Sequence, residues 1–309
     1  MAAEAILQRP KARNALTTEM MTTFAQGLSA AQSDPDIVNI VVRSDVEGAF
    51  CAGGDMRRIR QHVLDRDFAA AETFFRTEYA VNLAISRSAK PVVALVDGIC
   101  MGGGLGLSVH GTCLATTRAE FAMPEGLIGW FPDVGASRFL SRMPHRLGVW
   151  MGMTAGRLGA GDARAAGLVQ SVLAPGDIPE MQNLLRGGAS LDTLLGSCQN
   201  SAPGWSPGLE VLKIERAFSG ATLTEITSAL NVAGPWGAAQ LAQLNCASPS
   251  SLELALDVVT GGAGQDLEFG LEREFGMACK QLRHPDFIEG VRAVLVEKDR
   301  APRWQKNES

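Results

Sequence analysis

Two glycine-rich stretches of this sequence each follow an apolar run and lead into residues with helical spacing. "AGGD" occupies 52–55 and "MGGG" occupies 101–104, after the strand-like runs 37–45 and 91–98. A helix start carries backbone N–H groups without intrahelical acceptors, and the helix dipole favours negative charge there. Such a turn suits four chemistries: phosphate binding, a dinucleotide cofactor, a serine nucleophile, or an oxyanion held by backbone N–H groups.

Side chains around the second stretch argue against the first three chemistries. A phosphate-binding P-loop needs a lysine after its glycines, and none follows here. A dinucleotide fingerprint fails in both registers, because Leu107 or Val109 stands at the third glycine position. A serine elbow fails because His110 replaces the glycine after Ser108. We therefore expect Ser108 to be a structural helix residue and His110 to be packed or hydrogen-bonded.

The fourth chemistry uses the backbone and needs both turns. Glycine lets a ligand approach the free N–H groups, and two such turns could aim two donors at one carbonyl oxygen. An oxyanion hole of this kind polarises a carbonyl and stabilises the oxyanion or enolate formed from it. Each turn alone is explained by ordinary chain reversal, but the repeated arrangement favours the oxyanion hole.

Composition excludes several classes of protein. The 309 residues carry a net charge of −5 without a lysine or arginine block, which argues against a nucleic-acid partner. The six cysteines are scattered without a CxxC pair, so we expect free buried thiols in a reducing compartment and no metal site. Asp97 and five glycines interrupt the longest apolar stretch, 91–109, so it is no membrane span. Without a secretory signal, the expected location is cytoplasmic.

The pattern along the chain predicts an α/β core over 1–190 and a mainly helical region over 191–309. A Pro-, Gly- and Ser-rich linker is expected near 199–208. Asp286 with Glu289 three residues later predicts a capping box at a helix start. The helices predicted in the second region cover 249–262, 266–282 and 285–299.

Four motifs in order resemble the crotonase superfamily of acyl-CoA enzymes. They are "FCAGGD" (50–55), "GICMGGGLGLSVHG" (98–111), "FAMPEGLIGWFPDVGAS" (121–137) and "RLGAGDARAAGLV" (157–169). The resemblance implies an α/β spiral of ββα repeats with a helical C-terminal region. Homo-oligomers, trimers or hexamers, are common in the superfamily, but a longer helical tail can cover the active site of its own chain instead. Few residues precede "QRPKAR" (8–13), where the family usually has an additional strand, which leaves open whether the first hairpin is present.

The resemblance also assigns roles to backbone and charged groups. The N–H groups of Gly54 and Gly103 would bind the thioester oxygen. The neighbouring residues implied in substrate binding are Gly53, Asp55, Gly102 and Gly106, and the cations implied for the phosphates and adenine of coenzyme A are Lys11, Arg57 and Arg58. Coenzyme A is then part of the substrate, and no separate cofactor is expected.

The carboxylates favour one branch of the superfamily. Its hydratases use two glutamates, but the first position here is Gly106 and only the second, Glu125 in "AMPEG", is acidic. Asp133 in "FPDVG" follows, and this combination resembles the 3-hydroxyisobutyryl-CoA hydrolases of valine breakdown. Glu125 and Asp133 would be the catalytic pair, Glu125 as nucleophile or as general base. The alternatives are an enoyl-CoA hydratase or isomerase and a non-catalytic acyl-CoA-binding protein.

Overall fold

A computed structural model describes residues 1–198 and 204–305, and the chain folds as two compact units of three segments each. The first unit comprises Met1–Gly54, Thr77–Phe121 and Leu158–Ser206. The second unit comprises Asp55–Arg76, Ala122–Arg157 and Pro207–Ser309. Residues 199–203, at the start of the predicted linker, lie outside the described residues.

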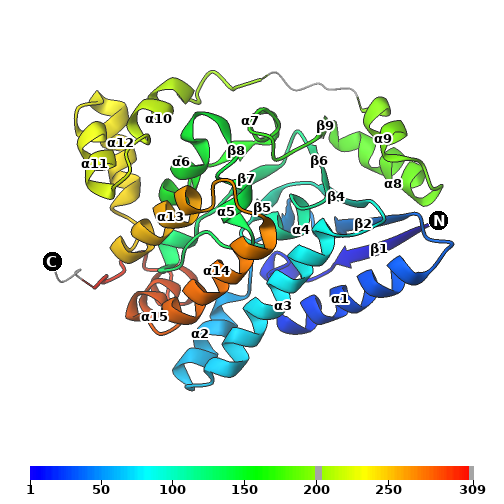
Figure 1. Cartoon of the computed structure of the whole chain (residues 1–309), viewed down its shortest axis with the longest axis horizontal. Coiled ribbons are helices and arrows are strands. Elements are labelled where there is room, and N and C mark those ends of the chain that lie inside the picture. The colour runs from blue at the N-terminus through cyan, green and yellow to red at the C-terminus, as the bar shows by residue number, and fades with distance from the viewer. Residues whose placement is uncertain (199–203, 306–309) are drawn as a thin grey trace. The chain divides into compact units, whose positions relative to one another are not determined.

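Two sheets organise the first unit (Figure 1). A five-stranded parallel sheet has the order β1 (Ala2–Leu7), β2 (Asn39–Ser44), β4 (Val92–Val96), β6 (Thr112–Thr116), β9 (Ser171–Leu173). A four-stranded sheet has the order β3 (Ala49–Cys51), β5 (Ile99–Met101), β7 (Glu120–Ala122), β8 (Leu158–Gly159). The chain adds a strand to the first sheet and then a shorter one to the second, three times in succession. This alternation confirms the predicted α/β class built from repeats with two strands each.

Burial on both faces explains why the parallel strands are apolar runs. All five residues of β4 are buried, as are the first four of β2. Helices α8 (Ile178–Arg186) and α9 (Leu191–Ser197) bury Met181, Leu185 and Leu194 in a core cluster with strand residues. The other helices that begin or end in this unit are α1 (Thr18–Ser33), α3 (Phe68–Ser86), α4 (Gly103–Ser108) and α7 (Ala160–Ala165).

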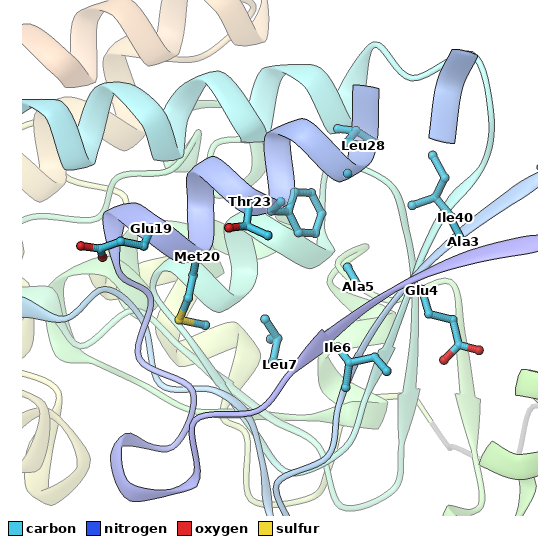
Figure 2. A pocket seen from close by; sticks show the side chains of 12 residues that line it. Ala3, Glu4, Ala5, Ile6, Leu7, Glu19, Met20, Thr23, Leu28 and Ile40 are labelled. Carbon is cyan, nitrogen blue, oxygen red and sulfur yellow. The ribbon is translucent and has the colours of Figure 1, made fainter. Parts of the chain in front are cut away.

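The first strand, left open by the sequence, is present. β1 pairs with β2 in parallel register from Ala2 opposite Asn39 to Leu7 opposite Ser44, and it forms an edge of the sheet. An apolar groove of about 490 Å³ lies between β1 and α1, where Met20 and Leu7 point toward each other (Figure 2). None of the predicted site residues lines this groove.

The described part of the second unit is helical apart from the end of β7. Its helices are α2 (Met56–Leu64), α5 (Ala136–Phe139), α6 (Leu147–Thr154), α10 (Val211–Ala217), α11 (Leu223–Asn231), α12 (Gly234–Leu244), α13 (Pro249–Gly261), α14 (Leu267–Gln281) and α15 (Pro285–Val291), with a 3-10 turn at Glu125–Ile128 and a π-helical turn at Arg292–Val296. This confirms the predicted helical C-terminal region. Trp130 is buried in the second unit, stacked on Phe75 and Phe131 with ring centroids 4.7 and 5.2 Å away.

The predicted capping box at Asp286 and Glu289 is wrong. α15 begins at Pro285, and its N-cap is His284, two residues before Asp286, whose backbone N–H donates to the His284 ring. Asp286 is buried and accepts from Ser248 Oγ at 2.6 Å, while Glu289 pairs with Arg292. Proline favours the first helical position, and this preference sets the helix start.

All six cysteines are free, as expected, although not all are buried. Cys51, Cys100, Cys113 and Cys198 are buried, whereas Cys246 is exposed. Burial raises the pKa of Cys51 and of Cys113 to about 12, so these thiols are unreactive at neutral pH. Within residues 1–198 and 204–305, no helix has the length and apolar character needed to cross a bilayer.

Candidate active site

The two glycine turns converge in the first unit. A Cβ placed on Gly53 would lie 3.7 Å from Gly103 N and 3.8 Å from Gly102 Cα. A Cβ on Gly104 would lie 2.8 Å from Cys51 O. A side chain at position 104 would therefore drive the two turns apart, whereas at position 53 it is the φ of 99° that favours glycine. The predicted pairing of the turns is therefore present, and glycine is what allows it.

Local backbone geometry presents N–H groups at this junction. Gly102 has φ 50° and ψ −118°, and Gly53 has φ 99°, both in regions that glycine adopts without a steric penalty. Gly103 is the first residue of α4, so its N–H has no acceptor within that helix. Gly54 follows Gly53 directly and forms a parallel bridge with Leu16. These are the two N–H groups that the motifs assign to the oxyanion hole.

A buried glutamate that the motif analysis did not identify lies against Gly103. Glu78 on α3 is 2 % exposed, and a Cβ on Gly103 would lie 2.3 Å from its Oε1. The same Cβ would lie 2.9 Å from Leu16 Cδ1. Glu78 and Leu16 thus fix the position of the first turn of α4.

Ser108 is structural, as expected. Its hydroxyl is buried and donates to Gly104 O at 3.0 Å. Ser108 ends α4, so the half-buried His110 lies beyond the helix. Gly106 is buried inside α4, where a hydratase of this superfamily is expected to carry an acid.

In the second unit, Glu125 carries a buried carboxylate. It begins the 3-10 turn after Pro124 and is 8 % exposed. Its Oε2 is buried and has no hydrogen-bond partner among the described residues. Burial, and then the charge of Asp133, raise the pKa of Glu125 well above its usual range. A carboxyl group with a raised pKa is a stronger base when ionised.

Asp133 lies close enough to Glu125 for their charges to interact, and an indole orients it. Asp133 is 5 % exposed, and Trp130 Nε1 donates to its Oδ2 at 3.2 Å. Trp130 is held by its aromatic neighbours and by its backbone N–H, which donates to the backbone carbonyl of Glu125 at 3.0 Å. Trp130 therefore contacts both predicted catalytic residues, Asp133 through its indole N–H and Glu125 through the backbone.

Helices of the C-terminal region hold the turn that carries Glu125. Ser248 N donates to Gly126 O at 3.1 Å, and Gln281 Nε2 donates to Gly129 O at 2.6 Å. Gly129 has φ 70°, and a Cβ there would lie 2.1 Å from Asp286 O. The starts of α13 and α15 and the end of α14 thus fix this turn from three directions.

The predicted coenzyme A cations are exposed. Lys11 lies on the 3-10 turn Pro10–Ala12 of the first unit, and Arg57 and Arg58 lie on α2 of the second unit. Asp55 is the N-cap of α2 and accepts from Arg58 N at 3.3 Å, which is a structural role. Within the described parts of the chain, no three His, Cys, Asp or Glu side chains gather to hold a metal ion.

Glu274 on α14 is a second buried glutamate that the motif analysis did not identify. It is 0 % exposed and occupies the apolar stripe formed by Leu267, Leu271 and Ala278. An acidic residue in the apolar stripe of a helix indicates a specific role that the sequence could have shown, because a buried carboxylate needs hydrogen-bond donors. Its donors are Gly135 N and Ser137 N, directly after the Asp133 segment.

Comparison with known proteins finds relatives that match nearly the whole chain. The model of the enoyl-CoA hydratase/isomerase family matches residues 2–309. A chicken protein named mitochondrial 3-hydroxyisobutyryl-CoA hydrolase is 38% identical over 97% of this chain and 80% of its own length. An Arabidopsis thaliana protein named probable 3-hydroxyisobutyryl-CoA hydrolase 3 is 34% identical over 97% and 83%.

Two solved structures match over nearly the whole chain. An enoyl-CoA hydratase from Rhodobacter sphaeroides gives a TM-score of 0.91 at 34% identity, covering 98% of this chain and 89% of that one. A carnitinyl-CoA dehydratase from Mycobacterium thermoresistibile gives the same TM-score and identity, covering 98% and 88%. The predicted crotonase resemblance is confirmed, and the chain belongs to the enoyl-CoA hydratase/isomerase family.

Proposed function

We propose that this protein is an acyl-CoA thioester hydrolase that acts on 3-hydroxyisobutyryl-CoA and also on 3-hydroxypropionyl-CoA. The observation that carries the proposal is the buried, electrostatically coupled pair of Glu125 and Asp133, together with glycine at position 106. A two-glutamate hydratase would need an acid at that position. The names of the curated relatives support the same reaction.

In this mechanism the backbone polarises the thioester and Glu125 acts on its carbonyl carbon. The N–H groups of Gly54 and Gly103 bind the carbonyl oxygen and stabilise the oxyanion that forms. In one route the Glu125 carboxylate attacks, the C–S bond breaks, and water then hydrolyses the resulting anhydride. In the other route Glu125 takes a proton from a water molecule that attacks directly. Both routes release coenzyme A as a thiol and regenerate Glu125.

Asp133 has two roles in this proposal. Its carboxylate accepts a hydrogen bond from the substrate's 3-hydroxyl or assists the water, with Trp130 holding it in place. Its negative charge also disfavours the ionised form of Glu125 and so strengthens Glu125 as a base. Exposed Lys11, Arg57 and Arg58 are the proposed partners of the coenzyme A phosphates. Coenzyme A enters as part of the substrate, without a separate cofactor.

A panel of acyl-CoA thioesters tests the reaction. We expect rapid release of free thiol from 3-hydroxyisobutyryl-CoA or 3-hydroxypropionyl-CoA and little loss of double-bond absorbance with crotonyl-CoA. Efficient hydration of crotonyl-CoA without thiol release would assign the protein to the hydratases instead. Binding of acyl-CoA without turnover of any substrate would make it a binding protein.

Replacing Asp133 with asparagine is expected to move the acid limb of the pH–rate profile to lower pH. Glu125 acts as a carboxylate, so kcat/KM rises with pH until the pKa of Glu125 is passed. Removing the neighbouring negative charge lowers that pKa, because the ionised form is then less disfavoured. The rate itself should fall less than for a change at Glu125. An unchanged acid limb would contradict the electrostatic role of Asp133.

Two further proposals come from the sequence. We expect a homo-oligomer, a trimer or hexamer, and a cytoplasmic location. The chicken relative is named mitochondrial, and that name applies to the relative.

A further inference from the structure

The buried carboxylate of Glu274 on α14 accepts hydrogen bonds from the turn that follows Asp133. Gly135 N donates to Glu274 Oε2 at 2.7 Å, and Ser137 N donates to Oε1 at 2.9 Å. Gly135 is the N-cap of α5, and Ser137 is in its first turn, so neither N–H has an acceptor within the helix. Glu274 supplies those acceptors from 137 or more positions away in the chain.

The backbone of this turn adopts an unfavourable conformation. Val134 has φ 54° and Gly135 has φ 85°, two successive residues in the left-handed region. A β-branched residue rarely adopts a positive φ, because its side chain crowds the backbone. Such a conformation persists only where surrounding contacts determine it. The strained residue is bonded directly to Asp133, so the same contacts determine where the Asp133 carboxylate points.

The helices on either side leave the turn no room to move. A Cβ on Gly262, after α13, would lie 2.1 Å from Ser137 O. A Cβ on Gly270 of α14 would lie 2.4 Å from Ser137 Oγ. Ser137 therefore packs against Gly262 and Gly270, and its backbone N–H donates to Glu274.

An ionised carboxylate at this buried position, near the charge of Asp133, costs free energy that a purely structural helix cap would not need to spend. Burial and, to a smaller extent, the charge of Asp133 raise the pKa of Glu274 to about 7, against the opposing effect of the hydrogen bonds from Ser137 and Gly135. A neutral acceptor would avoid both penalties. What the carboxylate adds is two charge-assisted hydrogen bonds in fixed geometry.

We infer that Glu274 is a positioning residue for the hydrolysis reaction: its carboxylate fixes the Val134–Ser137 turn and thereby the direction of the Asp133 side chain. Trp130 holds the Asp133 carboxylate by its Oδ2, and Glu274 holds its backbone. This inference rests on the proposed function, in which Asp133 contacts the substrate or the attacking water.

The test is a double-mutant cycle between Glu274→Gln and Asp133→Asn. Glutamine keeps the size but places an NH₂ donor against a backbone N–H. We expect Glu274→Gln to lower kcat/KM by about tenfold, because small misplacements of reacting groups are costly. In the Asp133→Asn background the same change should have less than about a twofold effect, since coupled residues are non-additive. Glu272→Gln, an exposed glutamate on the same helix, is the matched control and should change nothing.

Hydrogen exchange gives a readout independent of activity. In Glu274→Gln the Gly135 and Ser137 amides should exchange faster, while the β4 amides keep their protection. Should Glu274→Gln fail to fold, Gly262→Ala, whose Cβ would meet the backbone carbonyl of Ser137, displaces the turn with the carboxylate intact and should cause the same kinetic loss. Gly276→Ala is its control, because a Cβ there meets nothing within 4 Å.

The outcomes separate this inference from the proposed function. A wild-type protein that releases no thiol from any acyl-CoA would refute the proposed function, and the inference with it. A wild type that hydrolyses acyl-CoA, with losses that multiply in the double variant, would make Glu274 a support of the fold alone. Wild-type kcat/KM in both Glu274→Gln and Gly262→Ala would also overturn the inference.

Discussion

Replacing Glu125 with glutamine is expected to lower thioester hydrolysis by at least about 10²-fold, the usual scale for loss of a general base. Glutamine preserves the size of the side chain and keeps a hydrogen-bonding oxygen but cannot accept a proton or form an anhydride. The Glu125 carboxylate is available to react, because its Oε2 is buried without a hydrogen-bond partner among the described residues. Steady-state thiol release from 3-hydroxyisobutyryl-CoA measures the effect.

The control for this variant is Glu272→Gln, which removes an exposed carboxylate from the same unit. It should retain wild-type turnover, and acyl-CoA should still bind to Glu125→Gln, as calorimetry would detect. Near wild-type hydrolysis by Glu125→Gln would refute the mechanism while leaving the hydrolase assignment intact.

The two routes open to Glu125 differ in where a solvent oxygen ends up. In a single turnover in H₂¹⁸O, attack of water on the enzyme carbonyl of an anhydride places ¹⁸O in the Glu125 side chain. Direct attack of water on the thioester places it only in the released acid. Mass measurement of the peptide containing Glu125 therefore identifies the covalent route if it carries the label.

The parts of the fold that the sequence predicted are those with strong local signals. β4 is a continuous apolar run in which three of five residues are valine, and Asp55 is a preferred N-cap before α2. β3, β5 and β7 have three residues each, too few for any periodicity. Pairing with neighbouring strands, not local preference, makes them strands.

β6 shows the same limit in a central strand. Its sequence, "TCLAT", contains one large apolar residue, and it follows directly after the glycine-rich helix. It is a strand because it lies between β4 and β9, which bury it. That environment is created by residues far away in the chain, so no short window predicts it.

For the candidate site, motifs located the residues but not their supports. The glycine turns and the two acids could be predicted because their types and order are distinctive. Glu274 and Trp130 could not, because their roles depend on contacts with Ser137 and Asp133. Glu274 lies in a helix with four other charged residues, and only its place in the apolar stripe distinguishes it.

Replacing Gly103 with proline is expected to lower kcat by about 10²- to 10³-fold, the effect of losing one oxyanion-hole donor. Proline has no N–H, and Gly103 is the first residue of α4, where proline's backbone angles are tolerated. The loss should therefore come from the missing donor and not from breakage of the helix. Thiol release from 3-hydroxyisobutyryl-CoA gives kcat, and circular dichroism checks the fold.

Gly103→Ala separates the donor from the steric effect. Its Cβ would meet Glu78 Oε1 and Leu16 Cδ1, the same atoms that the proline Cβ meets, but it keeps the N–H. If the N–H binds the thioester oxygen, the alanine variant retains much more activity than the proline variant at similar thermal stability. Equal losses in both would mean that packing against Glu78 matters and the donor does not. A fully active, folded Gly103→Pro enzyme would remove Gly103 from the oxyanion hole, because no rearrangement of a proline restores an N–H.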